Sequence, residues 1–107
     1  MTGAGAPRVK ALAFMRDAVA EAFTVTSDDI AGRVRTRALA EARQCFYLVA
    51  RRCTRLSLPE LGKAIGRDHS TILDGVRKAQ KRMLHDWWYD AAARRLLLQF
   101  RGSVDGL

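Results

Sequence analysis

The chain has 107 residues, a length that predicts a single domain and leaves no room for an additional ATPase module. Apolar residues make up 49% and charged residues 28% of the sequence, values of ordinary soluble proteins that exclude a disordered chain and a membrane protein. With 19 Lys and Arg against 11 Asp and Glu, the formal net charge of +8 favours a polyanionic partner, either nucleic acid or an anionic membrane surface.

The N-terminal segment predicts a tail followed by one helix. Residues 1–7 are rich in glycine and alanine and carry little apolar surface, so a flexible tail is expected there. Between Val9 and Phe23, apolar residues recur at steps of three and four, which predicts a helix over about residues 8–23. No apolar run long enough for a signal peptide or a membrane span follows the N-terminus, so a cytoplasmic location is the default expectation.

A short helix and a basic loop are expected next. Thr26 stands three residues before Asp29, the order of a helix N-cap, and the helix that begins there is expected to end by Gly32. Residues 33–37 read Arg-Val-Arg-Thr-Arg. This alternation of arginine with shorter side chains, in a segment too short to bury them, predicts an exposed basic loop.

The segment after the loop predicts an amphipathic helix with a cationic side. Its apolar face consists of Leu39, Ala42, Phe46, Val49, Ala50 and Cys53, and another face carries Arg43, Tyr47, Arg51 and Arg55. Cys45 and Cys53 are eight residues apart, about 12 Å along a helix, which is beyond disulfide reach. They are expected to be reduced core residues, and because neither histidine lies at zinc-ligand spacing from a cysteine, no metal site is predicted.

The most informative pattern begins at Ser57. Ser57 suits a helix N-cap, Pro59 falls in the first turn, and Glu60 can reach back to the cap. This helix is expected to end at Gly66, and a new one to start from Asp68. The second helix has an apolar side with Ile72, Val76, Ala79 and Met83, and a polar, cationic side with Ser70, Asp74, Arg77, Lys78 and Lys81. Two helices joined by a glycine turn predict a helix-turn-helix.

The C-terminal segment leaves two interpretations open. Apolar residues cover more than one face of the helical stretch from Ala91 to Arg101. This segment is either a closing helix packed on the bundle or a partner-binding surface, whose candidate contacts are Trp87, Trp88, Leu97 and Phe100. Because no strand signal or repeat occurs, the predicted fold class is all-α, a small helical bundle containing a helix-turn-helix with an added C-terminal helix.

The sequence favours DNA binding over catalysis. A nucleophile, a base and an orienting group cannot be assembled, and the pair Gly62-Lys63 lacks the other residues of a phosphate-binding loop, so neither an enzyme nor a cofactor is predicted. The net charge would attract phosphates, the helix-turn-helix suits the major groove, and the basic loop suits the minor groove. A helical adaptor whose basic face only confers solubility remains an alternative.

Two adjacent motifs carry a family resemblance. They are LSLPELG at residues 56–62 and GRDHSTI at residues 66–72, and together they strongly resemble the signature of the C-terminal DNA-binding domain (domain IV) of the bacterial replication initiator DnaA. The resemblance covers about residues 8–84, which leaves residues 1–7 as a tail and residues 85–107 as an extra C-terminal helix and tail. It implies monomeric, sequence-specific binding of double-stranded DNA through both grooves.

The resemblance also implies individual DNA contacts. Arg35 matches the arginine that reads the minor groove. The residues that match base contacts in the major groove are Asp68, His69, Ser70 and Thr71. The residues expected to contact the DNA backbone are Arg37, Arg43, Gln44, Arg51, Leu58, Pro59, Arg67 and Lys78.

A transcription regulator is the expected function of a stand-alone domain of this kind. Small proteins similar to this domain act in phage and gene-transfer-agent regulation, and the ATPase domain that opens replication origins is expected to be absent from this chain. The expected role is activation with a protein partner, either a second regulator or a component of RNA polymerase, in the bacterial nucleoid and without a membrane. The alternative is binding to a replication origin or competition for DnaA boxes.

Overall fold

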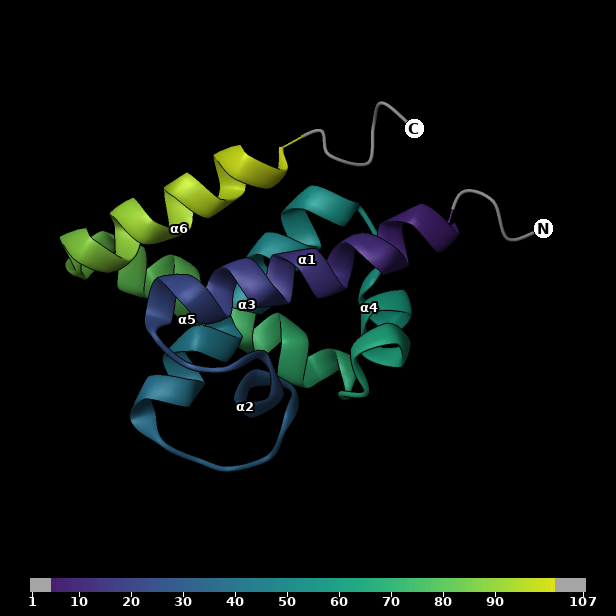
Figure 1. Cartoon of the computed structure of the whole chain (residues 1–107), viewed down its shortest axis with the longest axis horizontal. Coiled ribbons are helices and arrows are strands. Elements are labelled where there is room, and N and C mark those ends of the chain that lie inside the picture. Colours follow the sequence, from purple (N-terminus) through teal and green to yellow (C-terminus); the bar gives the residue numbers. More distant parts are fainter. Residues whose placement is uncertain (1–4, 102–107) are drawn as a thin grey trace.

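The computed structural model describes residues 5–101, and of residues 5–7 only the backbone (Figure 1). The described part folds into helices α1 (Gly5–Phe23), α2 (Ser27–Ala31), α3 (Arg37–Thr54), α4 (Leu58–Ile65), α5 (His69–His85) and α6 (Trp87–Phe100), without strands. The all-α prediction, with a helix-turn-helix formed by α4 and α5 and a further helix after it, is therefore confirmed. None of the described helices is both long and apolar enough to cross a membrane.

The predicted N-terminal tail needs a partial correction. Helix α1 begins at Gly5, three residues before the predicted start, and so includes Pro7. A proline is tolerated there because the first backbone N–H groups of a helix have no partner within the helix. The rest of the predicted tail, residues 1–4, lies outside the described residues.

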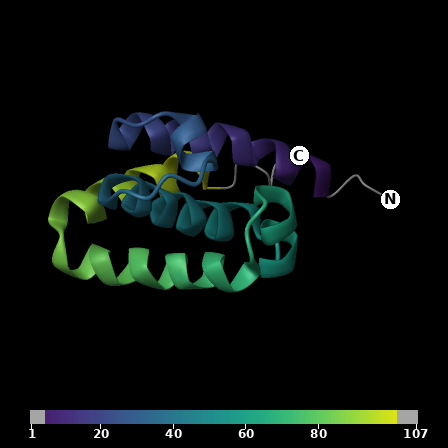
Figure 2. The same ribbon diagram turned by 90° about the horizontal axis from the view of Figure 1, so that it is seen from below.

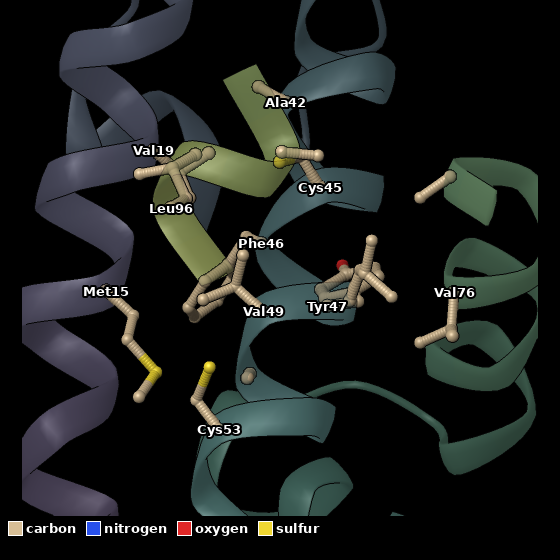
Figure 3. Packing of buried hydrophobic residues seen from close by; sticks show 14 of the residues in the cluster. Met15, Val19, Ala42, Cys45, Phe46, Tyr47, Val49, Cys53, Val76 and Leu96 are labelled. Carbon is tan, nitrogen blue, oxygen red and sulfur yellow. The ribbon is translucent and has the colours of Figure 1, made fainter. Parts of the chain in front are cut away.

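Helix α3 forms the centre of the molecule. It contacts each of the other five helices, and Figure 2 shows it between α1 on one side and α5 on the other. Figure 3 shows how α1, α3 and α6 pack: Val19 and Leu96 lie against each other beside α3. Both predicted core cysteines are buried with free thiols, and burial raises the pKa of Cys45 to about 12, so this thiol stays protonated at neutral pH.

Tyr47 departs from the predicted cationic face of α3. Its side chain is buried, with 5% exposed, and points toward α5 (Figure 3). The space for the ring comes from Gly75, because a Cβ atom at that position would lie 2.5 Å from Tyr47 Cδ2. A glycine inside α5 thus allows α3 and α5 to approach across a tyrosine.

We expect Gly75→Ala to lower the free energy of unfolding by about 1–3 kcal/mol, since the added methyl group overpacks a closed contact and shifts the ring of Tyr47. Urea unfolding followed by circular dichroism measures the change. Alanine ordinarily stabilises a helix relative to glycine, so an unchanged or higher stability would show that the Tyr47 ring moves aside freely.

Helix α6 belongs to the hydrophobic core. Its buried side chains are Tyr89, Ala93, Leu96 and Phe100, and Leu97 packs against the same core. The Tyr89 hydroxyl also donates a hydrogen bond of 3.1 Å to the carbonyl oxygen of Glu41 in α3. The predicted partner contacts Leu97 and Phe100 thus lie on the side of α6 that packs against α1, α3 and α5, with Phe100 buried and Leu97 partly buried. Partner binding through α6 stays a prediction.

The two tryptophans differ in their surroundings. Trp87 is 81% exposed, and so is Leu84, which lies three residues earlier in the last turn of α5. Trp88 is 46% exposed, and its ring packs perpendicular to the ring of Phe23 of α1, with ring centroids 5.4 Å apart. Of the four predicted partner contacts, Trp87 is thus the one with a largely free side chain.

Candidate nucleic-acid interface

Helix α4 begins with the predicted capping box. The Ser57 hydroxyl accepts a hydrogen bond of 3.2 Å from the Glu60 backbone N–H, and the Glu60 carboxylate accepts one of 2.8 Å from the Ser57 backbone N–H. The second bond lowers the pKa of Glu60, because it stabilises the charged carboxylate. Pro59 lies in the first turn and Gly66 ends the helix in a left-handed conformation with a φ of 78°, as predicted.

A close backbone approach fixes the turn between α4 and α5. A Cβ atom at Gly62 would lie 2.7 Å from the carbonyl oxygen of Arg67, so a larger residue would push the turn away from α4. Asp68 then caps α5 by accepting hydrogen bonds from the backbone N–H and the hydroxyl of Ser70. These bonds lower the pKa of Asp68, and the cap is therefore present at neutral pH. Both contacts set the direction in which α5 leaves the turn.

The first turn of α5 presents its predicted base-contacting side chains to solvent. His69, Ser70 and Thr71 are exposed, whereas the following Ile72 is fully buried in the core. The start of α5 is therefore anchored from behind by an apolar side chain and polar on its outer side. This arrangement suits a helix whose N-terminal end contacts the edges of bases.

Residues 32–36 form an extended loop between α2 and α3, visible as a wide arc in Figure 1. Arg33 and Arg35 are exposed in it, as predicted. Arg37 is not part of the loop: the hydroxyl of Thr36 caps α3, and Arg37 is the first residue of that helix, where it forms an ion pair of 3.2 Å with Glu41. The helix begins earlier than predicted because a threonine cap follows the arginines.

The guanidinium group of Arg43 holds the backbone of this loop. It donates four hydrogen bonds of 2.6–3.0 Å to the carbonyl oxygens of Asp29, Ile30, Gly32 and Val34. These acceptors include the end of α2 and the middle of the loop. The loop conformation therefore depends on an arginine of α3 that lies nine residues or more away in the sequence.

Arg67 connects the same loop to the helix-turn-helix. From the turn between α4 and α5 it donates hydrogen bonds to the carbonyl oxygens of Gly32, at 2.5 Å, and Ala31, at 3.1 Å. The Gly32 carbonyl oxygen thus accepts from both Arg43 and Arg67. This shared acceptor joins the basic loop, α3 and the helix-turn-helix at one point.

A groove of about 600 Å³ lies between the basic loop and α5. Its lining includes Arg33, Arg35 and Thr36 of the loop, Ala40 and Gln44 of α3, and Thr71, Asp74 and Lys78 of α5. The structure therefore brings the predicted minor-groove residue Arg35 and the predicted major-groove residue Thr71 to one concave surface. Within residues 5–101, no three His, Cys, Asp or Glu side chains gather as a metal site would require.

The predicted backbone contacts fall into two groups. Arg43, Arg51 and Arg67 direct guanidinium N–H groups at carbonyl oxygens of the chain itself, and for Arg51 the acceptor is Leu56 at 2.7 Å. The others lie at the surface or the groove: Arg37 at the start of α3, Gln44 and Lys78 in the groove, and Leu58 and Pro59 at the start of α4. The first group holds loops, a role that arginine content alone does not reveal.

Comparisons with known proteins agree with this geometry. Residues 13–79 match a family model described as the bacterial dnaA protein helix-turn-helix. The chromosomal replication initiator protein DnaA of Mycobacteroides abscessus is 40% identical over 80 residues, which cover 70% of this chain and 16% of that protein. The chain therefore matches about a sixth of the length of this curated relative.

A solved structure described as a crystal structure of a DNA replication initiation factor has a similar fold. Its TM-score is 0.77 at 22% sequence identity, over 92% of this chain and 30% of that one. The structural match covers 92% of this chain, which is more than the residues 13–79 matched by the family model. The likeness in fold therefore includes helices at both ends.

Proposed function

The chain belongs to the family of the bacterial DnaA helix-turn-helix, and from this premise we propose that it binds double-stranded DNA sequence-specifically, with α5 in the major groove and the basic loop in the minor groove. The observation that carries the proposal is the groove, which places Arg35 and Thr71 on one surface. The formal charge of +8 favours the same polyanionic partner.

The proposed base contacts come from two elements. Arg35 enters the minor groove, and His69, Ser70 and Thr71 contact base edges at the start of α5. Asp68 can serve both as cap and as base contact, because a carboxylate offers about four lone-pair sites and Ser70 does not use all of them.

The proposed backbone contacts are fewer than the arginine content implies. Leu58 and Pro59 bring the N-terminus of α4 to a phosphate, while Arg37 and Gln44 reach the backbone beside the groove. We assign Arg43, Arg51 and Arg67 to positioning of the loops, because each of them already donates at least one hydrogen bond to a carbonyl oxygen of the chain.

We expect Arg35→Ala to weaken specific binding by about 1–3 kcal/mol and to relax the sequence preference at one end of the site, since an arginine in the minor groove reads groove width and A·T content. Fluorescence anisotropy with specific and random duplexes measures both effects. Arg95→Ala removes an equal charge from the exposed side of α6 and is the matched control. Equal losses of affinity for specific and random DNA would show that Arg35 contacts only phosphates.

Salt dependence tests the proposal as a whole. Each phosphate neutralised by the protein lowers log K by about 0.9 for each unit of log salt concentration, so binding is expected to fall steeply between low and physiological salt. A flat response would contradict DNA binding and support the adaptor alternative. Equal affinity for all duplexes would show that the binding is not sequence-specific.

We further propose that DNA binding serves transcription regulation, as an activator that acts with a second regulator or an RNA polymerase component. The exposed Leu84 and Trp87 offer such a partner an apolar anchor outside the groove. A genome-wide binding map separates this role from the alternative, because promoters support regulation and replication origins or DnaA boxes support a role in replication.

A further inference from the structure

One carboxylate of the groove is not used to hold the fold. Asp68 caps α5, but Asp74, farther along the same helix, lines the groove with 62% of its side chain exposed. Its Oδ2 atom forms an ion pair of 3.0 Å with Nζ of Lys78, whose side chain is 60% exposed. Exposed pairs at this spacing contribute little to stability, so the fold does not account for an acid at this place.

An acid in a groove that receives DNA restricts what can lie opposite it. A carboxylate repels phosphates and can only accept hydrogen bonds. In the major groove, only the amino groups of cytosine and adenine donate, and the adenine amino group has the acceptor N7 beside it, whereas guanine and thymine present acceptors. Cytosine is therefore the base that Asp74 can contact without placing two acceptors face to face.

The lysine beside Asp74 can contact the second base of the same base pair. In a C·G pair, the cytosine amino nitrogen and guanine O6 are hydrogen-bonded to each other and lie about 2.9 Å apart. The acceptor Oδ2 of Asp74 and the donor Nζ of Lys78 are 3.0 Å apart, so the side chains present the same spacing with the opposite roles. Lysine is also one of the side chains that contact guanine O6 and N7.

We propose that Asp74 and Lys78 together read one C·G base pair in the major groove. Asp74 accepts from the cytosine amino group, and Lys78 donates to O6 or N7 of the paired guanine. The inference rests on the proposed function and adds a base-reading pair to it, in which Lys78 contacts a base instead of the DNA backbone. At a T·A or A·T pair the carboxylate loses its donor or meets N7, which adds a penalty against the wrong site.

Selection from randomised double-stranded DNA by the full chain tests the proposal. The natural protein is expected to select C·G at one position of its site, with about 5- to 100-fold discrimination. Asp74→Asn is expected to change that position to A·T, because an amide matches N6 and N7 of adenine, and Asp74→Ala to remove the preference there alone. Asp90→Asn is the matched control, since the Asp90 and Arg94 pair has the same spacing and lies on α6, outside the groove.

The remaining outcomes separate the two proposals. If the natural protein selects a sequence and both Asp74 variants select the same one, Asp74 reads no base and the inference is overturned. If Lys78→Met weakens all sequences equally, Lys78 contacts a phosphate and reading by the pair is overturned. If the natural protein selects no sequence at all, the proposed function itself fails.

Discussion

Leu96→Ala is expected to lower the free energy of unfolding by about 2–5 kcal/mol, a large part of the roughly 5–15 kcal/mol of a typical domain. Leu96 is 2% exposed and lies beside Val19 of α1 (Figure 3), so its truncation leaves a cavity between α1, α3 and α6. Chemical denaturation with urea measures the change.

Leu98→Ala is the matched control on the same helix. Leu98 is 64% exposed, and its replacement is expected to change stability by no more than about 0.5 kcal/mol. If Leu96→Ala were equally harmless, α6 would be an appendage that the rest of the chain does not need for folding, and the DNA-binding region would fold without it.

Arg43→Met is expected to lower the free energy of unfolding by about 2–3 kcal/mol and the affinity for specific DNA by about tenfold or more. The variant keeps an apolar stem and loses all four hydrogen bonds to the loop, each of which involves a charged donor. Once the backbone of residues 32–36 is free, Arg35 must be ordered again at the moment of binding, which costs affinity. Urea unfolding and anisotropy measure the two effects.

Arg52→Met on the same helix is the control that separates the loss of the loop contacts from the loss of one positive charge. Arg52 is exposed in the last turn of α3, and its replacement removes an equal charge without changing the loop. If both variants lost equal affinity on specific and random DNA, and neither lost stability, Arg43 would act as a phosphate contact and its role in positioning the loop would be wrong.

The features that the sequence predicted correctly are local. The cap at Ser57, the cap at Thr26 and the glycine at the end of α4 each depend on residues within one helical turn, and the structure contains all of them. Apolar periodicity likewise identified the buried side of α5, because a regular helix places residues three and four positions apart on one face.

The features that the sequence missed depend on distant residues. Arg67 and its acceptor Gly32 are 35 positions apart, and nothing in either segment distinguishes an arginine that binds a carbonyl oxygen from one that binds a phosphate. Tyr47 is buried because a glycine of another helix leaves room for it. The apolar residues of α6 cover more than one face, so its buried side, with Phe100, could be assigned only once α1 and α3 were in place.

The Gly32 carbonyl oxygen, which accepts from Arg43 and Arg67 at once, holds the basic loop and the helix-turn-helix at a fixed distance, and these are the two elements proposed to contact bases. The loop and α5 cannot slide independently, so the number of base pairs between their contacts is set by the protein. One inserted base pair would turn the two halves of the site by about 35° and separate them by about 3.4 Å. We expect such a spacer variant to bind no better than random DNA, and equal binding would show that the loop adjusts its position.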